Sequence, residues 1–191
     1  MKHILHFFIC IIIILTGCSR KDAAPDNTKQ VHDQLHGKYK VISSTSRDAV
    51  DINMDGIATT DLLVEVPAIN QSYRGLEIRI VDKDKFLLDE SWPQQYLDYG
   101  ANPDVYDPSV AINYVDQGAT RLFSLKDNSN EIIVKPDTDY IPDPVKFPFP
   151  TSVTIEGPEL IKIVLNRKFY TSKGSITTTV TTVYKRFTMI T

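Results

Sequence analysis

The segment at residues 51–55 carries three oxygen-bearing side chains on alternate residues, a spacing that suits a cation-binding loop. Asp51, Asn53 and Asp55 would turn their oxygens toward one centre, and Gly56 directly after them permits a sharp turn. Carboxylate and amide oxygens are the ligands that Ca²⁺ prefers in proteins. We therefore predict that this segment binds Ca²⁺ as a cofactor that stiffens the loop.

The same segment resembles the first half of the EF-hand and dockerin calcium loops. On that resemblance the backbone carbonyl of Ile57 adds a ligand and Asp61 closes the site, although Leu62 occupies the closing position of an EF-hand. Glu65 is a second candidate for the closing ligand. The alternative is a solvated turn of Asp, Asn and Gly residues between two strands.

A second group of candidate residues is aromatic and lies in the segment 91–108, which lacks strand periodicity and contains three prolines. Trp92, Tyr96, Tyr99 and Tyr106 are interspersed with acids and amides, so their rings could stack on sugar rings or contact a protein. We predict a long loop whose exposed rings bind a ligand. The alternatives are a lid packed over one end of the fold and a gate for an apolar ligand.

No catalytic constellation stands out in the chain. Of the four histidines only His32 and His36 lie beyond the first 17 residues, and no Gly-x-Ser-x-Gly elbow or glycine-rich phosphate loop is present. The 24 Asp and Glu residues offer acid pairs by chance alone, and the net charge of −3 comes without a basic stripe that could neutralise phosphates. We therefore predict that the protein is not an enzyme and does not bind nucleic acid, with a hydrolase ranked last.

The first 18 residues carry a signal for export and lipid attachment. Lys2 gives a positive start, residues 4–15 are almost continuously apolar, and residues 15–18 read Leu-Thr-Gly-Cys. An apolar stretch of about 12 residues suits a signal peptide, since a membrane-spanning helix needs roughly 20. The ending resembles the lipobox of bacterial lipoproteins. The resemblance implies removal of residues 1–17, acylation of Cys18, and a lipid anchor in a membrane of the bacterial cell envelope, with the outer membrane expected. The alternative is an ordinary cleaved signal.

The mature chain is expected to be one domain behind a tether. Residues 18–34 are predicted to be a flexible tether, because a charged and polar composition without apolar periodicity cannot build a core. Residues 35–191 have the length of a single domain. Cys10 would leave with the signal and Cys18 would carry lipid, so the domain must hold together without a disulfide.

Alternation of apolar and polar residues dominates the chain after residue 36 and predicts strands. The clearest cases are residues 76–81 and 161–169, and residues 176–187 are rich in Thr and Val. Short Asp, Asn and Gly turns between the runs predict antiparallel hairpins. We therefore predict an all-β fold, an antiparallel up-and-down barrel or alternatively a β-sandwich. The predicted strands are residues 37–45, 61–66, 75–82, 85–90, 109–115, 119–125, 131–135, 151–156, 159–170 and 175–188.

Two segments resemble lipocalin-like domains. Leu35, Gly37, Tyr39 and Val41 follow the family's opening pattern Leu-x-Gly-x-Trp-x-Val, with Tyr39 in the place of the Trp, and residues 182–186 are similar to the last strand of small bacterial lipocalin-like lipoproteins. The resemblance implies that residues 35–191 form a barrel that binds a small apolar molecule or a glycan without catalysis. The alternative function is a structural or accessory subunit that contacts an envelope protein through its surface loops.

Overall fold

The computed structural model describes four stretches of the chain, residues 27–71, 75–98, 100–136 and 143–191. The predicted signal peptide, the lipid attachment site Cys18 and the ligand-contact candidate Tyr99 lie outside these residues. Within the described stretches, no helix is long and apolar enough to cross a membrane.

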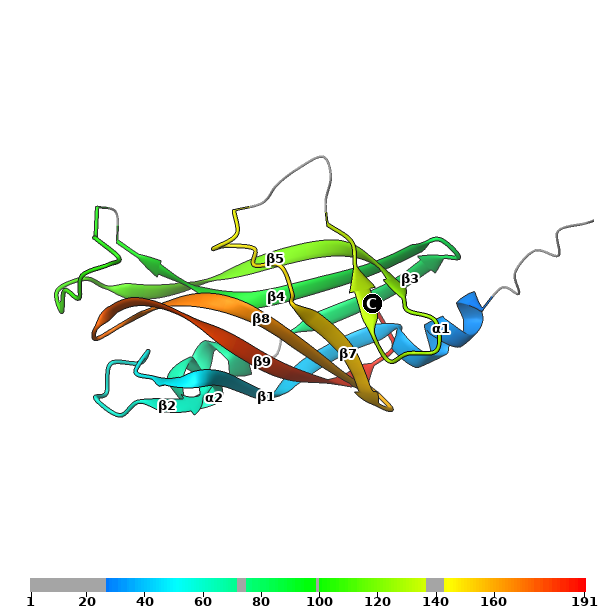
Figure 1. The fold of residues 1–191 in the computed structure, drawn as a ribbon, viewed down its shortest axis with the longest axis horizontal. Helices are drawn as coiled ribbons and strands as arrows, with labels where there is room; N and C mark the ends of the chain where they lie inside the picture. The colour runs from blue at the N-terminus through cyan, green and yellow to red at the C-terminus, as the bar shows by residue number, and fades with distance from the viewer. Residues whose placement is uncertain (1–26, 72–74, 99, 137–142) are drawn as a thin grey trace, which may run out of the picture.

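The described chain folds as an antiparallel β-barrel with short helical segments (Figure 1). The elements in chain order are α1 (Thr28–Leu35), β1 (Gly37–Val50), β2 (Thr59–Asp61), α2 (Leu62–Glu65), the 3₁₀ helix η1 (Pro67–Asn70), β3 (Leu76–Asp82), β4 (Lys85–Leu97), β5 (Ile112–Leu125), β6 (Ile132–Val134), β7 (Ser152–Gly157), β8 (Leu160–Thr171) and β9 (Gly174–Thr188).

Strands that follow one another in the chain lie side by side, which makes an up-and-down arrangement. The order around the sheet is β6-β5-β4-β3-β1-β9-β8-β7, and the short β2 pairs with the end of β1. At the remaining seam between β6 and β7, Glu131 pairs with Thr154 and the Ile155 N–H donates to the Asn130 carbonyl at 2.8 Å. The result is a nearly closed barrel of eight strands, which confirms the predicted all-β antiparallel barrel rather than the β-sandwich.

Several predicted strand boundaries are wrong: β1 and β4 run on past the predicted ends at residues 45 and 90, and two other regions differ more. The sequence predicts two strands on either side of a turn at residues 116–118, but β5 runs unbroken because these residues pair with β4. The predicted strand at 61–66 is mostly the helix α2. Asp61 caps this helix, since its Oδ1 accepts the Leu63 N–H at 2.9 Å.

The folded domain begins earlier than predicted. Residues 28–34, which the sequence analysis assigns to the tether, form most of α1. Val31 and Leu35 are buried against the barrel, and the Tyr39 hydroxyl donates to the Leu35 carbonyl at 2.6 Å. Two apolar residues four positions apart define one face of a helix, but this signal is too short to stand out in a polar segment.

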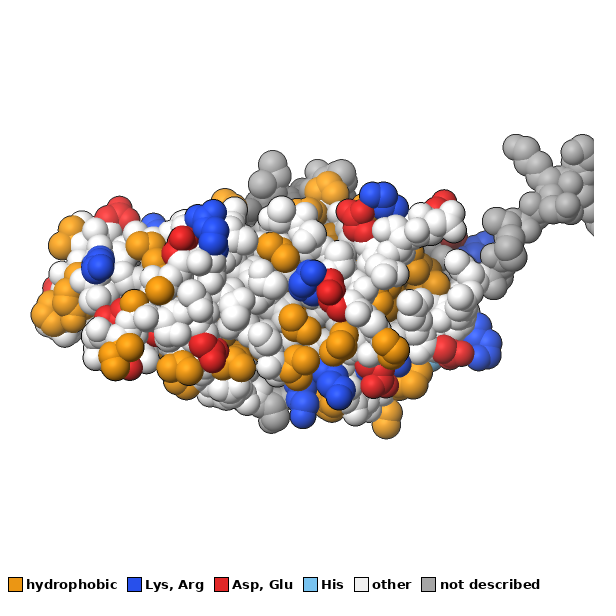
Figure 2. Space-filling view, turned by 60° about the horizontal axis from the view of Figure 1, so that its bottom comes forward, with side chains coloured by type: hydrophobic (Ala, Val, Ile, Leu, Met, Phe, Trp, Pro, Cys, Tyr) orange, Lys and Arg blue, Asp and Glu red, His pale blue; other side chains and the backbone are white. Residues whose placement is uncertain are grey.

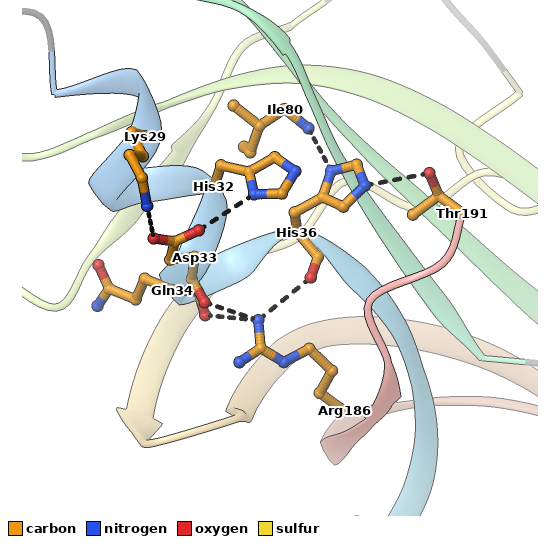
Figure 3. Close-up of polar contacts among 8 residues, drawn as sticks. All are labelled: Lys29, His32, Asp33, Gln34, His36, Ile80, Arg186 and Thr191. Carbon is orange, nitrogen blue, oxygen red and sulfur yellow. Dashed lines mark hydrogen bonds and ion pairs between the residues drawn. The ribbon is translucent and has the colours of Figure 1, made fainter.

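Figure 3 shows how the C-terminal end of α1 is held by the barrel. Arg186 of β9 donates from Nη1 to the carbonyls of Asp33, Gln34 and His36 at 3.1, 3.2 and 3.1 Å. Carbonyls at the end of a helix lack partners within it and carry the negative end of its dipole, so a guanidinium satisfies both needs. From β3, the Ile80 N–H donates to His36 Nδ1 at 3.1 Å.

We expect the free energy of unfolding to decrease as the pH falls below about 6.5, the ordinary pKa of His, and His36 becomes protonated. Burial lowers the pKa of His36, and the charges of His32 and Arg186 lower it further. A pKa that is lower in the folded chain stabilises the fold above the ordinary His pKa, and this contribution is lost as the pH falls through the lowered value. Protonated Nδ1 cannot accept the Ile80 N–H, a hydrogen bond worth about 1 kcal/mol.

Urea titration across this pH range tests the prediction. His36→Asn places an oxygen acceptor near the Nδ1 position but does not titrate, so its unfolding midpoint should vary less with pH. His32→Ala should make the loss of stability smaller, because it removes a neighbouring charge that lowers the pKa of His36 and so brings that pKa closer to its value in the unfolded chain. An unchanged pH dependence in His36→Asn would contradict this role of the imidazole.

Candidate functional site

Three connecting segments meet at the end of the barrel opposite α1, which we call the distal loop end (Figure 1). It consists of the described residues within 51–58, 98–111 and 172–174. The Ser172 hydroxyl donates to Asp51 Oδ2 at 3.0 Å, and the Ser175 hydroxyl donates to the Pro103 carbonyl at 2.6 Å. The structure thus places the predicted calcium segment and part of the aromatic segment at one end of the molecule.

Tyr170, near the end of β8, fixes the aromatic segment to the barrel. Its hydroxyl accepts the Asp107 N–H at 2.7 Å and donates to the Val105 carbonyl at 3.1 Å. The ring of Tyr106 lies beside it, with the ring centroids 6.3 Å apart. The Gln95 side chain adds two hydrogen bonds to the Tyr170 backbone, at 3.1 and 2.7 Å. Tyr170 and Gln95 are missing from the site predicted from the sequence, because no local pattern links positions so far apart.

The five predicted calcium ligands are not gathered into one set. Asp55 closes its own turn, since Oδ1 accepts the Ile57 N–H at 2.8 Å and Oδ2 accepts from Asn53 Nδ2 at 3.2 Å. Asp61 caps α2, and Asp51 accepts the Ser172 hydroxyl. In the described part of the chain, no group of three or more His, Cys, Asp or Glu side chains is placed to hold a metal ion. Calcium binding itself stays a prediction.

Trp92 is a core residue, which corrects its assignment to an exposed ligand-binding loop. β4 continues through residues 91–97, and the Trp92 side chain is only 2% exposed. The single proline in this part of β4, Pro93, did not prevent pairing with β5. Tyr96, which lies on β4 and not in a loop, and Tyr106 are exposed, at 54% and 40%, and ligand binding by their rings stays a prediction.

A buried ionic network occupies the barrel interior around Trp92. The Arg167 Nη2 donates to Glu90 Oε1 at 2.8 Å, and the Tyr184 hydroxyl donates to the same oxygen at 3.0 Å. The Arg167 guanidinium carbon lies 3.9 Å from the centre of the Trp92 ring, a cation–π contact. Burial raises the pKa of Tyr184 well above its ordinary value, so the phenol keeps the proton that it donates.

The contacts of Glu90 and Gln95 join two walls of the barrel directly. Both residues belong to β4, and their partners Arg167 and Tyr170 belong to β8. In the sheet, β3, β1 and β9 separate these two strands, so the contacts cross the interior. Together with the buried ring of Trp92, they fill the space between the walls at these levels.

Exposed apolar and acidic side chains share the distal loop end, as Figure 2 shows. Isolated exposed apolar residues are ordinary, whereas several close together mark interaction surfaces. The apolar members are Ile57, Val105 and Tyr106, and the exposed ring of Tyr96 lies on β4 just before the 98–111 segment. The exposed acids are Asp55, Asp98, Asp104 and Asp107.

Two surface grooves lie in the half of the barrel near α1. One, of about 500 Å³, runs between α1, the β7–β8 turn and Arg186. The other, of about 660 Å³, is lined by Tyr39, Leu76, Phe187 and Ile190 among others. Both volumes are within the usual range for small-molecule sites.

Comparison of the chain with protein-family models, with curated proteins and with solved structures found no match. The functional argument therefore depends on the geometry described above.

Proposed function

We propose that this protein is a lipid-anchored lipoprotein of the bacterial cell envelope that binds a partner protein through its distal loop end, without catalysis. The observation that carries the proposal is the contrast between the two parts of the barrel. Its interior is crossed by buried polar contacts between β4 and β8, while the distal loop end exposes apolar rings and aliphatic side chains.

Helix α1, which follows the proposed anchor in the chain, and the proposed contact surface lie at opposite ends of the domain. Thr28 starts α1 only ten residues after Cys18, and ten residues reach at most about 35 Å even when fully extended. The acylated cysteine would therefore keep the α1 end near the membrane. The distal loop end would then face away from the lipid, where a partner can reach it (Figure 1).

The composition of the distal loop end suggests the chemistry of the partner. Tyrosine rings beside carboxylates provide apolar area together with hydrogen-bond acceptors, a common composition at protein interfaces. Exposed Asp98, Asp104 and Asp107 would favour a partner that presents basic residues around an apolar centre.

We expect Val105→Ser and Tyr106→Ala to reduce capture of the partner at least tenfold, because both remove apolar area from the distal loop end. The experiment crosslinks the full lipidated chain in intact cells and quantifies captured proteins by mass spectrometry. Val81→Ser is the matched control, since Val81 and Val105 are both 58% exposed and Val81 lies on β3 away from this end.

A Cys18→Ser variant tests the anchor in the same experiment, because it should leave the membrane fraction and lose capture of membrane-bound partners. Equal loss of capture in Val81→Ser and Val105→Ser would contradict the proposed surface. Retention of Cys18→Ser in the membrane with incorporated fatty acid would contradict the anchor.

The groove of about 660 Å³ favours a second candidate function, the binding of a small apolar molecule or a glycan. Tyr39, Leu76, Phe187 and Ile190 provide apolar parts of its lining, and polar parts come from residues such as Lys38, Glu77 and Asp89. Native mass spectrometry of the purified chain distinguishes the two functions. A bound small molecule that is lost in Phe187→Ser and retained in Val105→Ser would support the groove.

A further inference from the structure

Glu65 is a buried carboxylate without a cationic partner among the described residues. Its side chain is 0% exposed at the end of α2. Oε2 accepts the N–H groups of Ile52 and Asn53 at 2.7 and 3.3 Å, but Oε1 is buried and has no hydrogen-bond partner in the described chain. A buried carboxylate is stable only if its charge is compensated and its lone pairs are satisfied.

A second unsatisfied carboxylate oxygen belongs to the residue next to this contact. Asp51 immediately precedes Ile52, the residue whose N–H binds Glu65. Its Oδ2 accepts the Ser172 hydroxyl, while its Oδ1 is buried and has no partner among the described residues. The Glu65 carboxylate thus binds the N–H of the residue that follows Asp51, and each of the two acids has one buried oxygen without a hydrogen-bond partner among the described residues.

We infer that Asp51 and Glu65 hold a hard divalent cation, Ca²⁺ or Mg²⁺, between the 51–58 loop and α2. Such ions bind carboxylate and carbonyl oxygens and complete their shells with water. Two carboxylates neutralise a charge of +2, so the cation would compensate the buried negative charge of Glu65. Asp51 is only partly buried and its neighbour Asn53 is exposed, so water and ions can reach the site from the loop side.

This site differs from the set that the EF-hand resemblance implies. The proposed site leaves out Asp55 and Asp61, because Asp55 accepts the Ile57 N–H in its own turn and Asp61 caps α2. The bound ion would connect α2 to the 51–58 loop, and through Ser172 to the β8–β9 turn. It would stiffen the distal loop end whether or not that end binds a partner, so the inference is independent of the proposed function.

The test measures thermal unfolding of the full lipidated chain in detergent, with EDTA, with CaCl₂ and with MgCl₂. A saturating cation should raise the Tm of the wild type by about 5–10 °C. Glu65→Gln and Asp51→Asn should lose this increment, because each removes one of the two charges. Asp55→Ala is the control. It removes an EF-hand-type ligand but leaves the pair intact, so its increment should equal that of the wild type.

Calorimetric titration with CaCl₂ and MgCl₂ gives an independent readout, and Asp51→Asn decides the question if Glu65→Gln does not fold. The inference is overturned if neither cation changes the Tm or produces heat with the wild-type chain. It is also overturned if Asp55→Ala loses the increment while Glu65→Gln keeps it, since the EF-hand-type set would then be the site.

Discussion

Arg167→Met is expected to destabilise the domain by about 3–5 kcal/mol, because it leaves the buried carboxylate of Glu90 without its counter-charge. Glu90 is 6% exposed and receives hydrogen bonds from Arg167 and Tyr184 on the same oxygen. Without the Arg167 guanidinium, the Tyr184 phenol would be the remaining described hydrogen-bond donor to the carboxylate, with Arg121 as a neighbouring charge. Trp92 would lose the cation above its ring. Denaturant titration of the variant measures the loss.

The double variant Glu90→Gln/Arg167→Met is the informative control. Replacing both members of a buried ion pair often costs little, whereas removing one member costs most. We therefore expect the double variant to regain most of the stability that Arg167→Met loses. A single variant as stable as the wild type would mean that water reaches Glu90 and that the walls of β4 and β8 are not held together there.

The strands could be predicted from the sequence wherever short-range patterns determine them. The hairpin turns at residues 82–85 and 172–174 follow from Asp, Lys and Gly placed between alternating runs, and both are present. The break predicted at 116–118 is absent, because twelve successive pairs between β4 and β5 outweigh the local preference of Asp116, Gln117 and Gly118 for a turn. Long-range pairing of this kind has no signature in a short window of sequence.

The candidate site shows the same division between local and distant information. The spacing of Asn53 and Asp55 marks a tight turn, since these two residues bond to each other and Asp55 also accepts the Ile57 N–H. The loop is joined to the β8–β9 turn by the hydrogen bond between Asp51 and Ser172, which lies 121 positions further along the chain. The partners of Glu90 and Gln95 on β8 are 77 and 75 positions away. Only the folded barrel shows which polar residues cross the interior.

Trp92→Ala is expected to cost about 3–5 kcal/mol of stability, at least as much as Ile163→Ala at about 2–5 kcal/mol. The loop hypothesis predicts the opposite order, since an exposed ring would contribute to binding rather than to folding. In the structure Trp92 and Ile163 are each only 2% exposed. Trp92 has the larger side chain and also packs against Arg167.

Trp92→Phe is the control, because it keeps an aromatic face for the guanidinium and should recover much of the loss. Denaturant titration of the three variants decides the order. If Trp92→Ala proved clearly milder than Ile163→Ala, the ring would not be part of the core, and the case for an interior filled between β4 and β8 would fail.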